Sequence, residues 1–277
     1  MAAKLMKALR YDRYGGGAEG LKHVEIPIPT PKKNEVLLKL EAASLNPADW
    51  KYQKGMVRPF LPGKFPFRQN GGGLAEYAVA SKTMTVKRPP EVSASEGAAL
   101  PIAGVTALEA LTKAAERNVL ITAASGGVGH FAVQLAKLGN IHVTATCGAR
   151  NIELVKSLGA DESPSGRKYD AAISCATNIP WPTFEPNLSE NGKVIYIAPG
   201  PMTFLTYFMK KLTFSKKVLV PLLVSPKGEN LECMVGLVRD GKIKAVIDSK
   251  FPLAEAKEAW AKIMDGHATR KIIVTSE

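Results

Sequence analysis

The chain has 277 residues, of which 45% are hydrophobic and 22% charged, and its formal net charge is +12. This composition is typical of a globular protein with a sizeable core, arranged as one large domain or two smaller ones. The three cysteines, Cys147, Cys175 and Cys233, lie far apart without C-x-x-C spacing, which argues against a disulfide framework and a cysteine-rich zinc site.

The N-terminal part of the chain predicts β structure. Residues 5–50 and 71–89 alternate apolar and polar side chains in short runs bounded by proline and glycine. Residues 93–114 have a helical pattern. Ser93 or Ser95 is a candidate N-cap for that helix, because an acidic residue, Glu96, falls in the first turn.

From residue 118 the pattern changes to strands that alternate with helices. The strands are expected at 118–124, 141–148, 169–176 and 193–200, and the helices between the first three of them at 126–139 and 149–160. Strands that are apolar throughout predict a parallel sheet with helices on both faces. The C-terminus adds a strand at 245–251, a helix at 253–266 and a last strand at 271–275.

A glycine-rich turn, "TAASGGVGH", separates the first of these strands from its helix. The small residues follow the spacing A-x-x-G-x-x-G, at Ala123, Gly126 and Gly129, and not the strict G-x-G-x-x-G. Such a strand–turn–helix lets the backbone approach a pyrophosphate, with helix N–H groups pointing at it. We therefore expect a dinucleotide site. The alternative is a turn that binds nothing.

The end of the second strand favours NADP(H) over NAD(H). An NAD site usually has an acidic residue there, about 20 residues after the glycines, to bind the ribose 2′-hydroxyl. The stretch "TATCGARN" has no acid and instead offers Arg150, whose planar fork suits a 2′-phosphate. The alternative is that Arg150 is only an exposed residue of the next helix.

The basic residues are scattered along the chain. The densest groups are 209–217 and 242–250, and neither has the interleaved aromatic residues of a single-strand nucleic-acid binder. Ordinary solvated faces are therefore favoured, with a patch that contacts an anionic membrane as the alternative. No apolar run approaches the roughly 20 residues that span a bilayer. The N-terminal residues have no long apolar region and no small-residue cleavage site, so we expect no secretory signal.

Four longer strings resemble a known family. The strings "SLNPADWK" (44–51), "LPIAGVTALEAL" (100–111), "VLITAASGGVGHFAVQLAK" (119–137) and "LGAD" (158–161) resemble the zinc-independent quinone oxidoreductase branch of the medium-chain dehydrogenase/reductases. The resemblance implies a GroES-like β-barrel catalytic domain at 1–104 and an NADP-binding Rossmann domain, a doubly wound parallel sheet, at 105–249. Residues 250–277 would return to the catalytic domain. The active site would lie in the cleft between the two domains.

The resemblance also implies roles for individual residues. Asn46 would lie by the nicotinamide and the substrate carbonyl, and a neighbour such as Lys51 or Tyr52 would help to stabilise the enolate. The residues implied in cofactor binding are Thr106, Ser125, Gly126, Gly127, Val128, Cys147, Arg150, Cys175, Ala176, Ala198, Pro199 and Gly200. Each also has a plainer reading. Asn46 could be a turn residue before Pro47, Thr106 a helix N-cap and Cys175 a buried core residue.

The chain departs from the family pattern in several places. It lacks the catalytic cysteine, the His-Glu pair and the four-cysteine lobe of zinc-dependent relatives, so no metal is expected; His23, His130, His142 and His267 are scattered. Segments of the family pattern are missing near 67–71, 115–118 and 161–164, and a barrel without its middle strands should not close. The barrel is therefore expected to be incomplete. Arg270 stands where the family favours glycine.

These features predict an NADPH-dependent reductase of α,β-unsaturated carbonyl compounds, such as lipid-derived enones, enals and oxylipin ketols. Quinone reduction is the first alternative. The second is a nucleotide-binding protein without catalysis, held on a membrane by its basic surface. Small-molecule enones or quinones are the expected partners, with an anionic membrane or a second copy in a homodimer as further candidates, and no nucleic acid. Within the branch, the resemblance to plant members implies the chloroplast inner envelope, with peripheral attachment and no cleavable transit peptide; the cytoplasm is the alternative.

Overall fold

The computed structural model of the chain describes residues 4–56, 72–162, 166, 168–177, 179–225, 227–266 and 268–276. The chain forms two compact units. Unit 1 consists of Met1–Ile102, Lys227–Arg239 and Ala245–Glu277, and unit 2 of Ala103–Pro226 and Asp240–Lys244. No helix in the described ranges has the length and apolar character needed to cross a bilayer.

Three small sheets make up the β structure of unit 1. β1 (Leu5–Arg10) pairs antiparallel with β2 (Lys22–Pro27), and β3 (Glu35–Lys39) pairs antiparallel with β5 (Tyr77–Ser81). The third sheet has the order β11-β12-β4, with bounds Ile247–Pro252, Lys271–Thr275 and Ala42–Leu45. Among the described residues these sheets do not join into one closed barrel, as expected for a barrel that lacks its middle strands.

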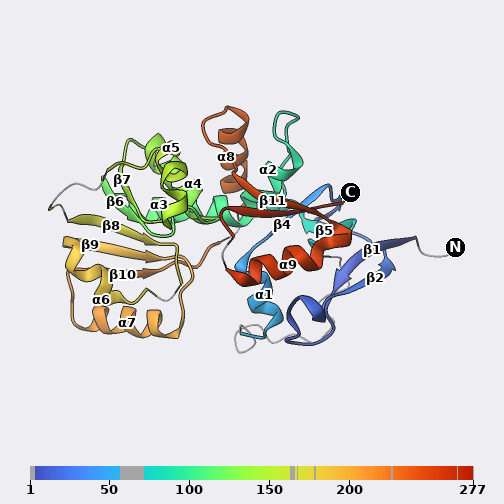
Figure 1. Cartoon of the computed structure of the whole chain (residues 1–277), viewed down its shortest axis with the longest axis horizontal. Helices are drawn as coiled ribbons and strands as arrows, with labels where there is room; N and C mark the ends of the chain where they lie inside the picture. The colour runs from blue at the N-terminus through green and yellow to red at the C-terminus, as the bar shows by residue number, and fades with distance from the viewer. Residues whose placement is uncertain are drawn as a thin grey trace. The chain divides into compact units, whose positions relative to one another are not determined.

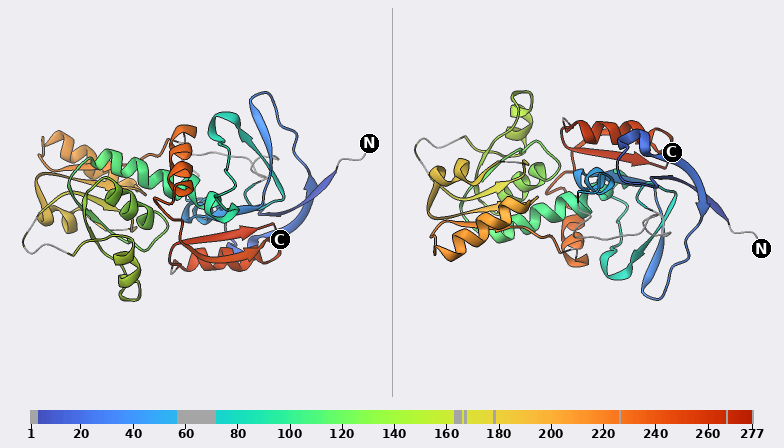
Figure 2. Two further views of the ribbon diagram at one scale, coloured as in Figure 1. Left: turned by 90° about the horizontal axis from the view of Figure 1, so that it is seen from above. Right: turned by 90° about the horizontal axis from the view of Figure 1, so that it is seen from below.

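The third sheet joins the two ends of the sequence. β12 pairs antiparallel with β4, with Ile272 opposite Leu45, and parallel with β11. In Figures 1 and 2 the red C-terminal strands therefore lie beside blue N-terminal segments of the same unit. The chain thus closes unit 1 only when its last strand is in place.

Short helices complete unit 1. Their bounds are η1 (Gly17–Gly20), α1 (Pro47–Gln53), η2 (Lys82–Met84), α2 (Ala94–Ala99), α8 (Gly228–Arg239), η6 (Leu253–Glu255) and α9 (Ala256–Asp265). Ser93 is the N-cap of α2, as one of the two predictions has it: its Oγ accepts from the Glu96 N–H, and the Glu96 carboxylate accepts from the Ser93 N–H. The capping box fixes where α2 begins.

The single helix predicted over 93–114 is wrong in one respect. The structure divides it into α2, a π-helical turn η3 (Leu100–Gly104) and α3 (Val105–Ala114). Pro101 explains the division, because proline has no N–H and its ring clashes with the preceding helical turn.

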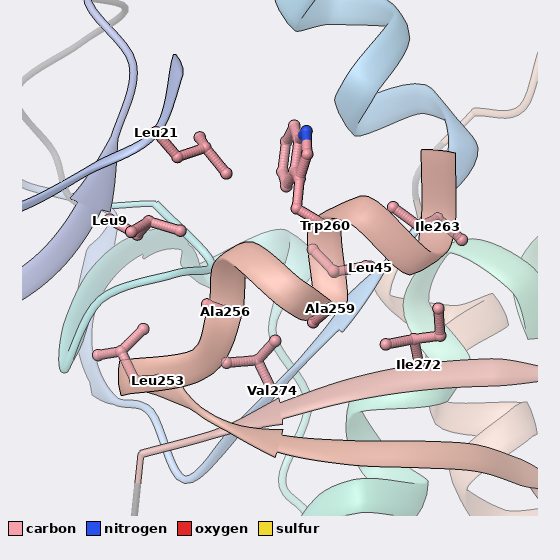
Figure 3. Close-up of a cluster of buried hydrophobic side chains, with 10 residues drawn as sticks. All are labelled: Leu9, Leu21, Leu45, Leu253, Ala256, Ala259, Trp260, Ile263, Ile272 and Val274. Atoms are coloured by element: carbon pink, nitrogen blue, oxygen red, sulfur yellow. The ribbon is translucent and has the colours of Figure 1, made fainter. Parts of the chain in front are cut away.

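The core of unit 1 is built around α9 (Figure 3). Trp260 and Ile263 of α9 pack in one cluster with Leu9, Leu21 and the side chains of the third sheet. The Trp260 Nε1–H donates to the Gln53 Oε1 at 3.2 Å, and the Gln53 Nε2 donates to the Gly17 carbonyl at 2.6 Å. Gln53 is fully buried, and these two bonds give one partner each to its amide oxygen and its amide nitrogen.

Unit 2 is a parallel five-stranded sheet with the order β10-β9-β8-β6-β7. The strands are β6 (Asn118–Ile121), β7 (His142–Ala145), β8 (Tyr169–Ser174), β9 (Leu188–Tyr196) and β10 (Val218–Pro221). The helices are α3, α4 (Gly129–Leu138), η4 (Ala149–Asn151), α5 (Ile152–Ser157), α6 (Trp181–Phe184), η5 (Glu185–Asn187) and α7 (Pro201–Leu212). Figure 1 shows α3, α4 and α5 on one side of the sheet and α6 and α7 on the other, which confirms the predicted doubly wound arrangement.

β7 is the last strand at its edge of the described sheet. Beyond it only an isolated parallel bridge joins Thr144 to Asp161. The Asp161 carboxylate accepts from the Val143 N–H and from Lys137 Nζ, which ties this segment to β7 and α4. A further strand, which the family pattern has after "LGAD", is replaced in the described residues by this short bridge.

Replacing Trp260 with alanine tests the core of unit 1. The loss of a buried aromatic ring that also bonds Gln53 is expected to lower the free energy of unfolding by about 3–5 kcal/mol. Met84→Ala, at a side chain that is 48% exposed in the same unit, serves as the control and is expected to stay within about 0.5 kcal/mol of the parent. Denaturant unfolding measures both. Equal losses in the two variants would contradict this account of the core.

Candidate functional site

The glycine-rich turn occupies residues 122–128 and leads from β6 to α4. Ala123 takes a left-handed φ of 48°, and its carbonyl accepts from the Gly126 N–H at 2.9 Å. A Cβ on Gly129 would lie 2.5 Å from the Ala123 oxygen and 2.6 Å from the Ala124 Cα, so only glycine fits there. The turn is therefore as tight as the sequence motif predicts. Because Gly129 has no side chain, the turn can stay tight enough for its backbone to approach a pyrophosphate.

The ends of three parallel strands meet at this turn. The Ala124 N–H donates to the Thr146 carbonyl after β7, at 2.9 Å. The Thr122 Oγ1 accepts from the Cys175 N–H at 3.1 Å and from the Ala176 N–H at 3.4 Å, after β8. The segment after β8, with Cys175 and Ala176, is thus tied through Thr122 to the start of the glycine-rich turn. Thr122 was not singled out from the sequence, although a polar residue at the end of an apolar strand was a usable signal.

The remaining cofactor candidates lie along the same edge of the sheet or near it. Ala198, Pro199 and Gly200 follow β9, which is the neighbour of β8, and Gly200 precedes α7 as its N-cap. Because the carboxyl ends of parallel strands share one edge, these residues belong to the ligand-binding edge of a doubly wound sheet. Thr106 is buried in the first turn of α3, whose N-cap is Gly104, so the reading of Thr106 as an N-cap is wrong.

The two cysteines of this edge are poor nucleophiles. Burial raises the pKa of the Cys175 thiol to about 12 and also raises the pKa of Cys147. Both are therefore neutral thiols at physiological pH. Their part in a site is limited to packing and weak hydrogen bonding.

Arg150 follows β7 in the short helix η4. Its side chain is exposed, as both readings of the residue require. The next residue, Asn151, is buried, and its Nδ2 donates to the Ser125 Oγ at 3.3 Å. This bond attaches η4 to the glycine-rich turn. Asn151 is a second residue that the sequence did not single out.

Asn46 lies in unit 1 as the N-cap of α1, with Pro47 in the first helical position. Its side chain does not cap the helix; instead, the Asn46 N–H donates to the Asp49 Oδ2 at 2.7 Å. The amide Nδ2 donates to the Ser44 carbonyl at 3.1 Å, and the amide Oδ1 accepts from Lys271 Nζ at 2.6 Å. Asn46 is therefore a turn residue whose side chain is held by other partners.

Lys271 is a charged residue in the interior of unit 1, and sequence reasoning missed it. Its side chain is 3% exposed, and Nζ also donates to the Leu45 carbonyl at 3.2 Å. Burial lowers the pKa of Lys271 to about 8, while the nearby Asp49 carboxylate opposes this shift. Burial in turn raises the pKa of Asp49, and its bond from the Asn46 N–H and the Lys271 charge oppose that shift. Lys271, Asn46 and Asp49 thus form one polar cluster.

Lys51 and Tyr52 lie on α1 but take no part in this cluster. The Lys51 Nζ lies 5.7 Å from the centre of the Trp50 ring, and Tyr52 is 41% exposed. No hydrogen bond within the described residues joins either side chain to the Asn46 amide. In the described ranges, no group of three or more His, Cys, Asp or Glu residues is placed to hold a metal ion.

Arg270, which precedes Lys271, has a φ of 82°. This left-handed conformation costs a non-glycine residue roughly 1 kcal/mol or more. It explains why glycine is favoured at this position. His267 lies outside the described residues. So do 57–71 and 163–165, which include the places of two of the three segments that the chain lacks relative to the family pattern. At the third place, residues 115–117 form a short connection from α3 to β6.

The turn can be tested by adding one methyl group. Gly129→Ala is expected to lower the free energy of unfolding by about 1–3 kcal/mol, because its Cβ would overlap the Ala123 carbonyl. Gly148→Ala is the matched control, since its Cβ would meet no heavy atom within 4 Å and its φ is −65°. Denaturant unfolding compares the two. A Gly129→Ala variant as stable as the control would show that the turn is looser than described.

Comparison with known proteins identifies the family. Residues 150–274 match the family described as "Zinc-binding dehydrogenase". The chain is 60% identical to the "Chloroplast envelope quinone oxidoreductase homolog" of Arabidopsis thaliana, over 327 positions that cover 99% of each protein. It is 27% identical to the "NADPH-dependent alkenal/one oxidoreductase, chloroplastic" of the same plant, covering 98% of this chain and 80% of that protein.

A solved structure indicates the same family. The quinone oxidoreductase of Coxiella burnetii superimposes with a TM-score of 0.84 at 28% identity, covering 99% of this chain and 100% of that one. The alignment of 327 positions with the first relative is 50 longer than the 277 residues of this chain, so the relative carries internal residues that this chain lacks. The chain belongs to the quinone oxidoreductase branch of the medium-chain dehydrogenase/reductase family, and it is an oxidoreductase that uses a nicotinamide cofactor.

Proposed function

We propose that the protein reduces the C=C bond of α,β-unsaturated carbonyl compounds with NADPH. The observation that carries the proposal is the buried amide of Asn46. Its Nδ2 has two N–H groups, and in the described residues only one of them has an acceptor, the Ser44 carbonyl. The second is free to donate to a substrate carbonyl. The relative named as an alkenal/one oxidoreductase supports this class of substrate.

The chemistry follows from where charge develops. The glycine-rich turn and Arg150 would hold NADPH, which would supply a hydride to the β-carbon and become NADP⁺. The electron pair of the broken C=C π bond would then reside on the carbonyl oxygen of the substrate, as an enolate. Asn46 stabilises that oxygen by hydrogen bonding, in the manner of an oxyanion hole. Solvent, or a hydroxyl such as that of Tyr52, then protonates the α-carbon and completes the saturated product.

Quinone reduction is the alternative within the same enzyme class. The relatives named as quinone oxidoreductases support it, and an N–H donor that stabilises an enolate also stabilises a hydroquinone oxygen. The sequence also left open a nucleotide-binding protein without catalysis, which is set aside because the relatives are named oxidoreductases. The two remaining candidates differ only in substrate, so turnover on separate panels distinguishes them.

Turnover of enones, enals and quinones, with and without the Asn46 amide, tests the proposed function against quinone reduction. NADPH oxidation is measured with enones, enals and quinones, and enones or enals are expected to give the higher kcat/KM. Asn46→Ala is expected to lower kcat roughly 100- to 1000-fold, as loss of one oxyanion donor does, without weakening NADPH binding. Asn34→Gly, at an exposed turn residue of the same unit with a φ of 72°, is the control. A higher kcat/KM with quinones than with enones and enals would replace the proposal with quinone reduction, and no turnover of enones or enals would refute it.

We also propose that the cofactor is NADPH and not NADH. Arg150 supports this, because η4 is attached to the glycine-rich turn through Asn151 and Ser125 and the strand before it ends without an acid. A guanidinium there can pair with a 2′-phosphate through two parallel hydrogen bonds.

Arg150→Gln tests the choice of cofactor. The variant is expected to bind NADPH roughly 10- to 100-fold more weakly, since a charge-assisted hydrogen bond contributes about 1.5–3 kcal/mol, while NADH binding changes little. Lys156→Gln, an exposed lysine of α5, is the control. Titration by cofactor fluorescence measures the affinities of the parent and of both variants for NADPH and for NADH. Equal weakening for both cofactors would remove the 2′-phosphate from the account.

The surface of α7 supports a place on a plastid membrane. None of its residues is buried, and its outward side chains are apolar, as is the turn that follows: Met202, Leu205, Phe208, Met209, Leu212 and Phe214 are each more than half exposed. Lys211, Lys216 and Lys217 lie beside them, with Lys216 paired to Glu190. We call these residues the α7 face. Apolar side chains flanked by lysines suit the surface of an anionic bilayer.

Vesicle binding tests the α7 face. The protein is expected to co-sediment with vesicles of phosphatidylcholine and phosphatidylglycerol, less so in high salt, and not with phosphatidylcholine alone. The double variant Leu212→Ser, Phe214→Ser should bind at least tenfold more weakly, since each buried apolar side chain contributes about 1.5–3 kcal/mol. Leu5→Ser, at an exposed strand residue, is the control. A homodimer that the double variant dissociates, without vesicle binding, would instead assign the α7 face to a second copy of the chain.

A further inference from the structure

Lys271 has no role in the reaction proposed above, although it is the most thoroughly buried charged side chain of the described core. Burying an ammonium group costs several kcal/mol, which its partners repay only in part. A methionine of similar length would fill the same space without that cost. A purely structural role therefore explains the packing of Lys271 but not its charge.

The backbone places Lys271 beside Asn46. β12 and β4 run antiparallel with Ile272 opposite Leu45, so the next position along each strand sets Lys271 opposite Asn46. The side chains meet across this pair, with 2.6 Å between Nζ and Oδ1. The contact joins residues 225 positions apart in the sequence and lies wholly inside unit 1.

The contact also decides which way the Asn46 amide faces. An ammonium group has only donors, so it can bond the amide oxygen and not the amide nitrogen. With Oδ1 facing Lys271 and one Nδ2 hydrogen facing the Ser44 carbonyl, the amide cannot flip without losing both bonds. A positive charge on the oxygen side also polarises the amide and makes the remaining N–H a stronger donor.

We propose that Lys271 is a positioning residue for Asn46: its ammonium group fixes the amide so that an Nδ2 hydrogen is presented to the carbonyl oxygen of the substrate. This inference rests on the proposed function, in which that oxygen gains negative charge. Lys271 acts through Asn46 and does not touch the substrate.

The activity should depend on pH, because the charge of Lys271 depends on its burial and on the charged groups around it. Asp49 of α1 is the carboxylate that interacts with it. Two carboxylates of neighbouring elements have other partners: Asp248 of β11 bonds Lys262 and the Thr269 N–H, and Glu96 of α2 bonds its own N-cap. With its pKa lowered to about 8, Lys271 is protonated below that pH and loses its charge above it. The wild-type kcat/KM should therefore fall as the pH rises through about 8.

A double-mutant cycle tests the proposal. Lys271→Met is expected to lower kcat/KM roughly 10- to 100-fold at pH 7 with NADPH affinity unchanged, because a misplaced donor loses much of its effect. In Lys271→Met/Asn46→Ala the loss should be no greater than in Asn46→Ala alone. Lys271→Arg keeps a permanent charge and should retain more activity, with no fall near pH 8. Lys262→Met, which removes the ion pair with Asp248, is the control and should stay near wild type.

Two results would overturn the proposal. One is a Lys271→Met variant within about twofold of wild type; the other is full additivity of the Lys271 and Asn46 losses. The side-chain NH₂ resonances of Asn46 in ¹⁵N-labelled protein, assigned by their loss in Asn46→Ala, supply a readout that needs no turnover. They should shift in Lys271→Met and not in Lys262→Met. Unshifted resonances would refute the positioning role even if the wild type were inactive, so failure of the proposed function is distinguishable from failure of this one.

Discussion

The pairing of β12 with β4 is the contact on which unit 1 depends. It brings the last strand of the chain against a strand from the first fifty residues, and β12 also carries β11 on its other side. α9 then packs its tryptophan against the same sheet and against α1 (Figure 3). The register of that one pair sets Lys271 against Asn46. A slip of one residue would turn every side chain of β12 to the opposite face and separate the two.

In unit 2 the candidate site residues are positioned by the common edge of a parallel sheet, and not by one pair of strands from the two ends of the chain. Its parallel strands end at one edge, and side chains near those ends bond the backbone or side chain of a neighbouring segment, as Thr122 does to Cys175 and Asn151 does to Ser125. The φ of Ala123 and the lack of a side chain at Gly129 make the turn between β6 and α4 tight, as a pyrophosphate-binding turn requires. In the proposed function, residues of unit 2 would offer backbone donors and a guanidinium to a cofactor. Asn46 of unit 1 would offer an oriented amide to a carbonyl oxygen.

Sequence reasoning succeeded where the determining contacts are local. The glycine-rich turn at 122–128 and the Ser93 capping box follow from the spacing of residues a few positions apart. The parallel sheet follows from the alternation of short apolar strands with helices along the chain. It failed at Lys271, because lysine is ordinarily exposed and its partner is 225 positions away. It also failed at Pro101, where one helical pattern hid a π-helical turn. The motif around Asn46 pointed to that residue, but the orientation of its amide depends on a strand pairing that no local pattern contains.

We propose that this enzyme delivers a hydride to the β-carbon of a conjugated carbonyl compound. NADPH deuterated at C4 of the nicotinamide, used with an enone and the full-length chain, tests this directly when the product is examined by NMR. We expect a saturated ketone with deuterium at the β-carbon and a solvent-derived proton at the α-carbon. An allylic alcohol labelled at the former carbonyl carbon would contradict it, since that product comes from reduction of the C=O bond.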